Sequence, residues 1–136
     1  MTTVARGDFD VKLKPLTPYN QDESAKFARM SLDKQYQGDL EAASRGEMLA
    51  AGTAGADAKG SGGYVAIEHV TGTLNGRKGT FSLQHNATMT RGEPYLNIIV
   101  IPGSGTGELT GLAGKMNIII KGKHSYEFDY SLPAKP

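Results

Sequence analysis

The sequence predicts an all-β fold, an eight-stranded antiparallel barrel that closes on itself. From Tyr64 to Tyr130, short alternating apolar and polar runs are separated by glycine turns, and no segment has a helix-length pattern. The predicted hairpins follow one another along the chain, without the long crossover of a Greek key that would favour a sandwich. A chain of 136 residues with 18 glycines fits one such domain, over residues 1–136.

The first predicted strand covers residues 9–13, where apolar and charged residues alternate. Pro15 is expected to end this strand, because proline has no N–H to donate to a neighbouring strand. Residues 16–26 are polar and rich in turn formers, which predicts a loop with one helical turn near residues 22–25.

The next two strands are predicted on either side of a glycine turn. A period-two pattern predicts a long strand from Met30, in which Gly38-Asp39 forms a β-bulge. Ser44-Arg45-Gly46 is predicted to turn the chain into a returning strand over residues 47–53. The small, glycine-rich segment 53–63 is predicted to be a surface loop.

The C-terminal half provides five more predicted strands. Asn75-Gly76 is a strong signal for a tight hairpin, because both residues tolerate positive φ. Further connections are predicted at Arg91-Gly92, at 102–105 and at Gly122-Lys123. The strands between these turns cover residues 64–74, 81–90, 95–101, 108–121 and 124–132.

Two of these strands are apolar on both faces, at residues 96–101 and 118–120. A barrel strand that faces water should be polar outside, so an apolar outer patch needs a cover. A second copy of the chain would provide it, and we expect a homo-oligomer, either a dimer or a trimer. Cover by the chain's own N-terminal arm or loop is the alternative.

The composition excludes several classes of function. Fifteen basic and fourteen acidic residues leave a net charge of +1 without a long block of one sign, which does not favour nucleic-acid binding. The absence of cysteine excludes disulfides, thiol nucleophiles and thiolate metal sites. No segment approaches the ~18 apolar residues of a membrane span, and the first ten residues lack a signal-peptide core. We expect a soluble cytoplasmic protein without nucleic-acid or membrane partners.

The glycine-rich segment 103–115 does not fit a nucleotide-binding loop. A P-loop that ends at Gly114-Lys115 would need glycine at Leu109 and serine or threonine at Met116. Glycines at barrel corners explain the segment better. The three histidines also lack the close spacing of metal ligands, so we expect neither a cofactor nor a metal.

Glu68 and His85 are the candidate catalytic residues. If the Glu68 face of its strand is interior, desolvation raises the pKa of Glu68 and suits it to general acid or base chemistry. If Val65 and Ile67 face inward instead, Glu68 is solvated. His85 shares a face with apolar residues, which predicts an inward imidazole that either transfers protons, anchors a ligand or serves as a structural histidine.

Aromatic residues and a second histidine are the candidate ligand contacts. An aromatic lining with a few polar tips is typical of a small-molecule pocket, and also of an ordinary small barrel core. The candidate ligand-binding residues are Tyr36, Tyr64, Phe81, His124, Tyr126 and Phe128.

Two functions are compatible with these residues. In the first, the barrel binds a small, largely apolar molecule, with or without proton-transfer chemistry of an isomerase or cyclase type. In the second, large side chains such as methionines fill the interior, and the chain is a structural or oligomeric interaction module. Both an enzyme and a non-catalytic protein fit the sequence.

Several short motifs occur in a characteristic order along the chain. They are Gly38-Asp39-Leu40-Glu41, Gly46-Glu47-Met48-Leu49, Gly63-Tyr64-Val65-Ala66, Gly76-Arg77-Lys78-Gly79-Thr80-Phe81, Leu83-Gln84-His85, Ser104-Gly105-Thr106-Gly107-Glu108-Leu109 and His124-Ser125-Tyr126. In this order the chain resembles a bacterial family of unknown function that is grouped with the allene oxide cyclase-like barrels. The resemblance implies an eight-stranded barrel with a central cavity that commonly self-associates. It implies no reaction, because the relation to the plant cyclase concerns the fold.

Overall fold

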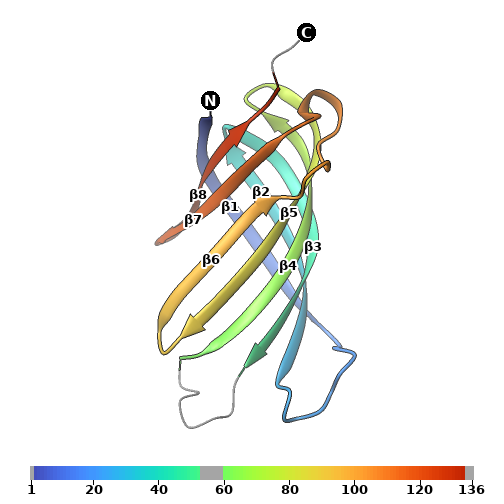
Figure 1. Cartoon of the computed structure of the whole chain (residues 1–136), viewed down its shortest axis with the longest axis vertical. Coiled ribbons are helices and arrows are strands. Elements are labelled where there is room, and N and C mark those ends of the chain that lie inside the picture. Colours follow the sequence, from blue (N-terminus) through green and yellow to red (C-terminus); the bar gives the residue numbers. More distant parts are fainter. Residues whose placement is uncertain (1, 53–59, 134–136) are drawn as a thin grey trace.

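The computed structural model describes residues 2–52 and 60–133 of the chain. In this part, eight antiparallel strands pair in sequence order and close a barrel when β8 pairs with β1 (Figure 1). The strands are β1 (Thr3–Leu16), β2 (Phe27–Gly38), β3 (Leu40–Gly52), β4 (Gly62–Leu74), β5 (Arg77–Thr90), β6 (Glu93–Val100), β7 (Ala113–Lys121) and β8 (Lys123–Ser131). The predicted fold class is confirmed.

Helix is almost absent from the described residues. A single 3-10 turn, η1 (Gly107–Leu109), precedes β7, and no helix there is long and apolar enough to cross a membrane. The strand predicted over residues 108–121 therefore starts five residues too early. Leu109 is fully buried, so this turn places an apolar side chain in the hydrophobic core of the barrel.

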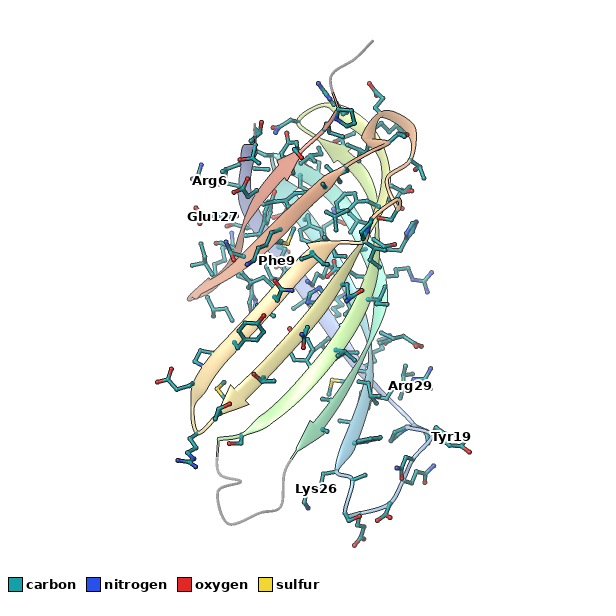
Figure 2. The ribbon with its side chains drawn as sticks, in the orientation of Figure 1. Arg6, Phe9, Tyr19, Lys26, Arg29 and Glu127 are labelled. Carbon is teal, nitrogen blue, oxygen red and sulfur yellow. The ribbon has the colours of Figure 1, made fainter. Side chains whose placement is uncertain are left out.

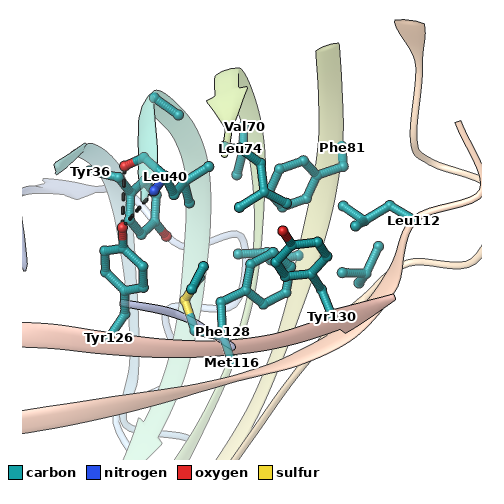
Figure 3. Close-up of a cluster of buried hydrophobic side chains, with 14 of the residues drawn as sticks. Tyr36, Leu40, Val70, Leu74, Phe81, Leu112, Met116, Tyr126, Phe128 and Tyr130 are labelled. Atoms are coloured by element: carbon teal, nitrogen blue, oxygen red, sulfur yellow. Dashed lines mark hydrogen bonds between the residues drawn. The ribbon is translucent and has the colours of Figure 1, made fainter. Parts of the chain in front are cut away.

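One half of the barrel is filled with apolar side chains. The rings of Phe81 and Phe128 stack with their centroids 5.8 Å apart, and both side chains are almost completely buried (Figure 3). Each such buried side chain contributes roughly 1.5–3 kcal/mol to folding. The Tyr126 hydroxyl accepts a hydrogen bond from the Leu40 backbone N–H at 2.9 Å and donates to the Gln37 carbonyl, so this core also holds the β2–β3 turn.

The other half of the barrel is less tightly closed. β6 and β7 share two register pairs, Ile98–Met116 and Ile99–Lys115, whereas β4 and β5 are paired from Gly62 to Leu74. Beyond these two pairs, β6 and β7 separate toward the end of the barrel that carries the β5–β6 turn (Figure 1). The sheet therefore encloses the interior of that half less completely.

The sequence interpretation of residues 38–46 was wrong. Gly38-Asp39 is the hairpin connection between β2 and β3, and Ser44-Arg45-Gly46 lies within β3. Gly38 has a φ of 105°, which side-chain-bearing residues rarely adopt, and this explains why the turn forms there.

Gly46 has a different role from a turn residue. It faces Glu68 in the register of β3 and β4, and a Cβ atom at position 46 would lie 2.0 Å from the Ile67 carbonyl oxygen. The sheet therefore curls too sharply at this position to accommodate any side chain.

The remaining predicted connections hold with small shifts. Pro15 lies near the end of β1, opposite Met30, and the strand continues to Leu16. In the predicted loop over residues 53–63, residues 53–59 lie outside the described part, and Gly62 already begins β4.

Candidate functional site

The structure decides which face of β4 points inward. Ala66, Glu68 and Val70 are buried, whereas Val65 and Ile67 are 54% and 53% exposed. Since side chains alternate across a strand, Glu68 projects into the barrel and its backbone neighbours project outward.

Glu68 and four other polar side chains meet between the packed half and the open half of the barrel. Glu68 Oε1 accepts hydrogen bonds from the Tyr36 hydroxyl and, at 2.8 Å, from Ser44 Oγ. Glu68 Oε2 accepts one from Lys34 Nζ at 2.8 Å and lies 2.6 Å from His85 Nε2. We call these five residues the polar layer. They come from β2, β3, β4 and β5, so the register of four neighbouring strands assembles the layer.

The carboxylate of Glu68 is strongly stabilised in its ionised form. Burial is the largest influence and raises the pKa of Glu68, but the His85 hydrogen bond and the Lys34 charge outweigh it and lower this pKa to about 2. The raised pKa expected from desolvation is therefore wrong. Glu68 is a fixed buried anion at neutral pH, which is a poor general acid or base.

Lys34 supplies the matching positive charge. Its side chain is 5% exposed, and its ammonium contacts the Tyr36 hydroxyl at 3.4 Å and the Phe9 ring, whose centroid is 4.9 Å away. Burial, followed by the charge of Glu68, raises the pKa of Tyr36 well above its ordinary value, so Tyr36 remains a neutral hydrogen-bond donor. One carboxylate thus faces one ammonium inside the barrel.

His85 is the polar-layer residue with unused hydrogen-bonding capacity. An ionised carboxylate only accepts hydrogen bonds, so we assign the hydrogen to His85 Nε2, which donates to Glu68. The other ring nitrogen, Nδ1, is buried and has no hydrogen-bond partner in the described residues. The imidazole also faces the Tyr64 ring, with 6.3 Å between the two centroids.

A cavity of about 200 Å³ lies inside the open half and ends on the polar layer. We call it the interior cavity. Its walls are mostly aliphatic and aromatic, with Lys34 and His85 at one end, and the wall residue Phe9 projects inward from β1 (Figure 2). The lining residues are Phe9, Val11, Leu13, Leu32, Lys34, Met48, Tyr64, Ala66, His85, Leu96, Ile118, Ile120 and His124.

The predicted site residues divide into three groups. Tyr64, His85 and His124 line the interior cavity, as the predicted binding role requires. Glu68 and Tyr36 belong to the polar layer but do not line the cavity. Burial, followed by the charge of Glu68, raises the pKa of Tyr64, so its hydroxyl is a neutral group on the cavity wall.

Phe81, Tyr126 and Phe128 lie elsewhere, in the packed half of the barrel. They belong to the continuous hydrophobic core and are at most 1% exposed. The sequence placed them correctly inside the barrel, but the interior cavity is lined by other residues. We therefore assign them to the core.

Two members of the polar layer were missed from the sequence. Lys34 lies two residues from both Leu32 and Tyr36, so the period-two pattern already placed it on their inward face. Because lysine is rarely buried, Lys34 was not considered as an interior residue despite its position in this pattern. Ser44 was missed because it was assigned to a turn that lies elsewhere.

A larger hollow, of about 890 Å³, lies on the outer face of β3 to β5. Its side chains include the outward-facing Leu49, Val65 and Ile67, which are 40–54% exposed. Tyr19, on the β1–β2 loop, borders it and is fully exposed (Figure 2). This hollow is larger, and His85 also belongs to its lining. The buried Lys34, however, borders the interior cavity and not the hollow, so we place the candidate site inside.

The residues of the site do not form a metal centre. Among the described residues, no three His, Cys, Asp or Glu side chains gather closely enough to hold a metal ion. Glu68 and His85 form a pair, and Lys34 occupies the position beside them.

Comparisons with known proteins place this barrel among relatives. The chain is 49% identical to a protein of unknown function from Shewanella oneidensis MR-1, whose crystal structure superposes with a TM-score of 0.90. The match covers 98% of this chain and 100% of that one. No curated protein matches the chain. Residues 5–130 match the model of a family described as protein of unknown function (DUF3224). The chain therefore belongs to the DUF3224 family, a family of unknown function with a bacterial member of known structure.

Proposed function

We propose that the barrel binds a small, largely apolar molecule in the interior cavity, with the polar end of that molecule against the polar layer. The observation that carries this proposal is the meeting of apolar cavity walls with a buried imidazole whose Nδ1 has no hydrogen-bond partner within residues 2–52 and 60–133. Binding sites commonly combine an apolar lining with a few convergent polar groups.

The size of the cavity limits the ligand. Pockets for drug-sized molecules measure roughly 300–1,000 Å³, and an engineered apolar cavity of about 150 Å³ binds benzene. A cavity of about 200 Å³ therefore suits a molecule with one ring or a short branched chain.

Proton transfer is the catalytic form of the same proposal. His85 lines the cavity, whereas Glu68 lies behind it, so His85 would contact the substrate and Glu68 would position the imidazole. This arrangement suits an isomerisation or cyclisation that needs no external oxidant or reductant. We also propose the place among allene oxide cyclase-like barrels, as a relation of fold that assigns no reaction.

The binding proposal is tested with two ring compounds of suitable size, 4-ethylphenol and 4-ethyltoluene, by isothermal titration calorimetry. We expect at least one of them to bind the wild-type chain. Ala66→Leu, which adds a side chain to the cavity wall, should abolish this binding. Ala43→Leu, an exposed alanine on the outer face of β3, is the matched control and should leave it unchanged. Absence of binding by both compounds, or equal binding by Ala66→Leu, would reject an interior site.

A second proposal concerns self-association, because the outer surface of the barrel is unevenly charged. β1 and β2 carry Arg6, Asp10 and Asp33 on their outer faces, whereas the outward positions at the centres of β4, β5 and β6 contain no Asp, Glu, Lys or Arg. The uncharged face includes the exposed Ile67 and Tyr95, and two copies would meet there without charge repulsion.

We propose a homo-oligomer through this uncharged face. Sedimentation velocity should give a monomer for Ile67→Lys and the wild-type assembly for Ala43→Lys, a matched lysine on the outer face of β3. A monomeric wild-type chain, or an Ile67→Lys assembly of unchanged mass, would reject this interface.

A further inference from the structure

The unpartnered nitrogen of His85 restricts the chemistry of the ligand. Buried polar atoms in proteins almost always have a hydrogen-bond partner, and an unmet one costs roughly 1–3 kcal/mol. Nδ1 of His85 is buried and has no partner in the described part of the chain, although the ring forms part of the cavity wall. A ligand that donates a hydrogen bond to Nδ1 would remove this cost.

The hydrogen-bonding role of Nδ1 follows from the other side of the ring. Nε2 donates its hydrogen to Glu68, whose carboxylate can only accept. In the neutral imidazole, Nδ1 then carries a lone pair and accepts a hydrogen bond. Glu68 thus selects the ring tautomer, as carboxylates do for histidines in many sites.

The charge balance of the polar layer argues against an anionic ligand. Lys34 is the cation beside the cavity, and its ammonium already contacts Glu68, Tyr36 and the Phe9 ring. With His85 in the tautomer that donates from Nε2, the buried carboxylate and the buried ammonium cancel, which leaves no net positive charge to offset the desolvation of a ligand anion. In this tautomer, the unpartnered atom of the histidine in the cavity wall is the hydrogen-bond acceptor Nδ1, among the residues that the structure describes.

We infer that the barrel selects neutral molecules with a single hydroxyl group, phenols or alcohols with an apolar body, whose O–H donates to His85 Nδ1. This inference rests on the proposed interior binding site and adds the chemical class of the ligand. His124, the other histidine on the cavity wall, plays no part in this selection. Its ring instead contacts Phe9, with 5.3 Å between the centroids.

The test compares 4-ethylphenol with 4-ethyltoluene, which replaces the hydroxyl by a methyl group of similar size. We expect the phenol to bind roughly tenfold more tightly, the effect of one buried hydrogen bond. The anion 4-ethylbenzoate should bind more weakly than the phenol. Equal affinities of the phenol and the toluene, or tightest binding of the benzoate, would overturn the inference but leave interior binding intact. If neither the phenol nor the toluene binds, the proposed function itself fails.

Matched variants of the two cavity histidines test which residue causes the preference for the phenol. His85→Phe should abolish the preference for the phenol over the toluene, while His124→Phe should retain it. A preference that survives in His85→Phe, or disappears in His124→Phe, contradicts the assigned atom.

A measurement on the unchanged chain avoids dependence on the folding of the variants. Long-range ¹H–¹⁵N spectra report the protonation and hydrogen bonding of each ring nitrogen. We expect Nδ1 of His85 to be unprotonated in the free protein and to shift on addition of 4-ethylphenol but not of 4-ethyltoluene. A protonated Nδ1 in the free protein, or no shift with saturating phenol, would refute the proposed contact.

Discussion

Replacement of Glu68 by glutamine tests the energetics of the polar layer. Glutamine has nearly the same shape but no charge, so Glu68→Gln leaves the Lys34 ammonium buried without a counter-charge. Tyr36 and Ser44 would still find an oxygen to which they can donate. The substitution therefore isolates the charge from the volume and from most of the hydrogen bonds.

The expected loss can be worked out from the structure. The pKa of Glu68 falls from 4.5 to about 2 in the folded state. At about 1.4 kcal/mol per pKa unit, this shift corresponds to roughly 3–4 kcal/mol of folding free energy at neutral pH. Breaking buried ion pairs in other proteins costs roughly 3–5 kcal/mol, which agrees. For a chain of this length, we expect a melting temperature lower by roughly 10 °C.

The assay is chemical denaturation at pH 7, followed by circular dichroism. Glu127→Gln is the matched control, because Glu127 forms its ion pair with Arg6 on the barrel exterior at 2.9 Å (Figure 2). These two side chains are 39% and 65% exposed, so the control should lose less than about 1 kcal/mol. If Glu68→Gln is no more destabilising than Glu127→Gln, our account of the polar layer is wrong.

The pH dependence provides a second check on the same residue. Because the folded-state pKa of Glu68 is depressed, its stabilisation is complete above about pH 4.5 and disappears as the pH falls toward about 2. The difference in unfolding free energy between the wild type and Glu68→Gln should therefore shrink over this window. A difference that stays constant from pH 5 to pH 2 would contradict the depressed pKa.

Three further variants test other parts of the structure by the same denaturation assay. The double variant Lys34→Met/Glu68→Gln should be more stable than Glu68→Gln alone, because it removes the unpaired ammonium; equal or lower stability would contradict this. Gly46→Ala should lose more than about 2 kcal/mol, since its Cβ would meet the Ile67 carbonyl oxygen at 2.0 Å, and a neutral effect would show that the sheet relaxes there. Tyr126→Phe should lose about 1–2 kcal/mol through its two backbone hydrogen bonds to the β2–β3 turn, and an unchanged midpoint would assign that turn's stability to other contacts.

Much of the barrel was predictable, because strand alternation and glycine turns are local signals. The Asn75-Gly76 turn and the inward face of β5 follow from neighbouring residues alone. Gly38 and Gly46 show where local signals fail. Gly38 was interpreted as part of a bulge and Gly46 as part of a turn. Gly38 is instead required by its positive φ, and Gly46 by the close approach of β4, which depends on residues more than 20 positions away.

The candidate site was predictable in part for the same reason. The inward face of β5 correctly placed His85 inside, and the orientation of Glu68 was an open alternative that burial resolved. The partners of Glu68 could not be predicted, because Lys34 and Ser44 reach it through the register of β2, β3 and β4. The height of each aromatic residue along the barrel axis also depends on register. Phe81 and Phe128 were therefore expected at the cavity, but they lie in the core.

The short ladder between β6 and β7 has a consequence for how a guest molecule would enter and leave. Strands that share two register pairs can part locally with the loss of a few hydrogen bonds, whereas parting β4 from β5 would disrupt much of the fold. Leu96 and Ile118, on the two strands that diverge there, are both wall residues of the interior cavity. We expect a ligand of the interior cavity to enter and leave between β6 and β7. The rate at which these strands separate, and not the affinity of the cavity alone, would then set the residence time of the ligand.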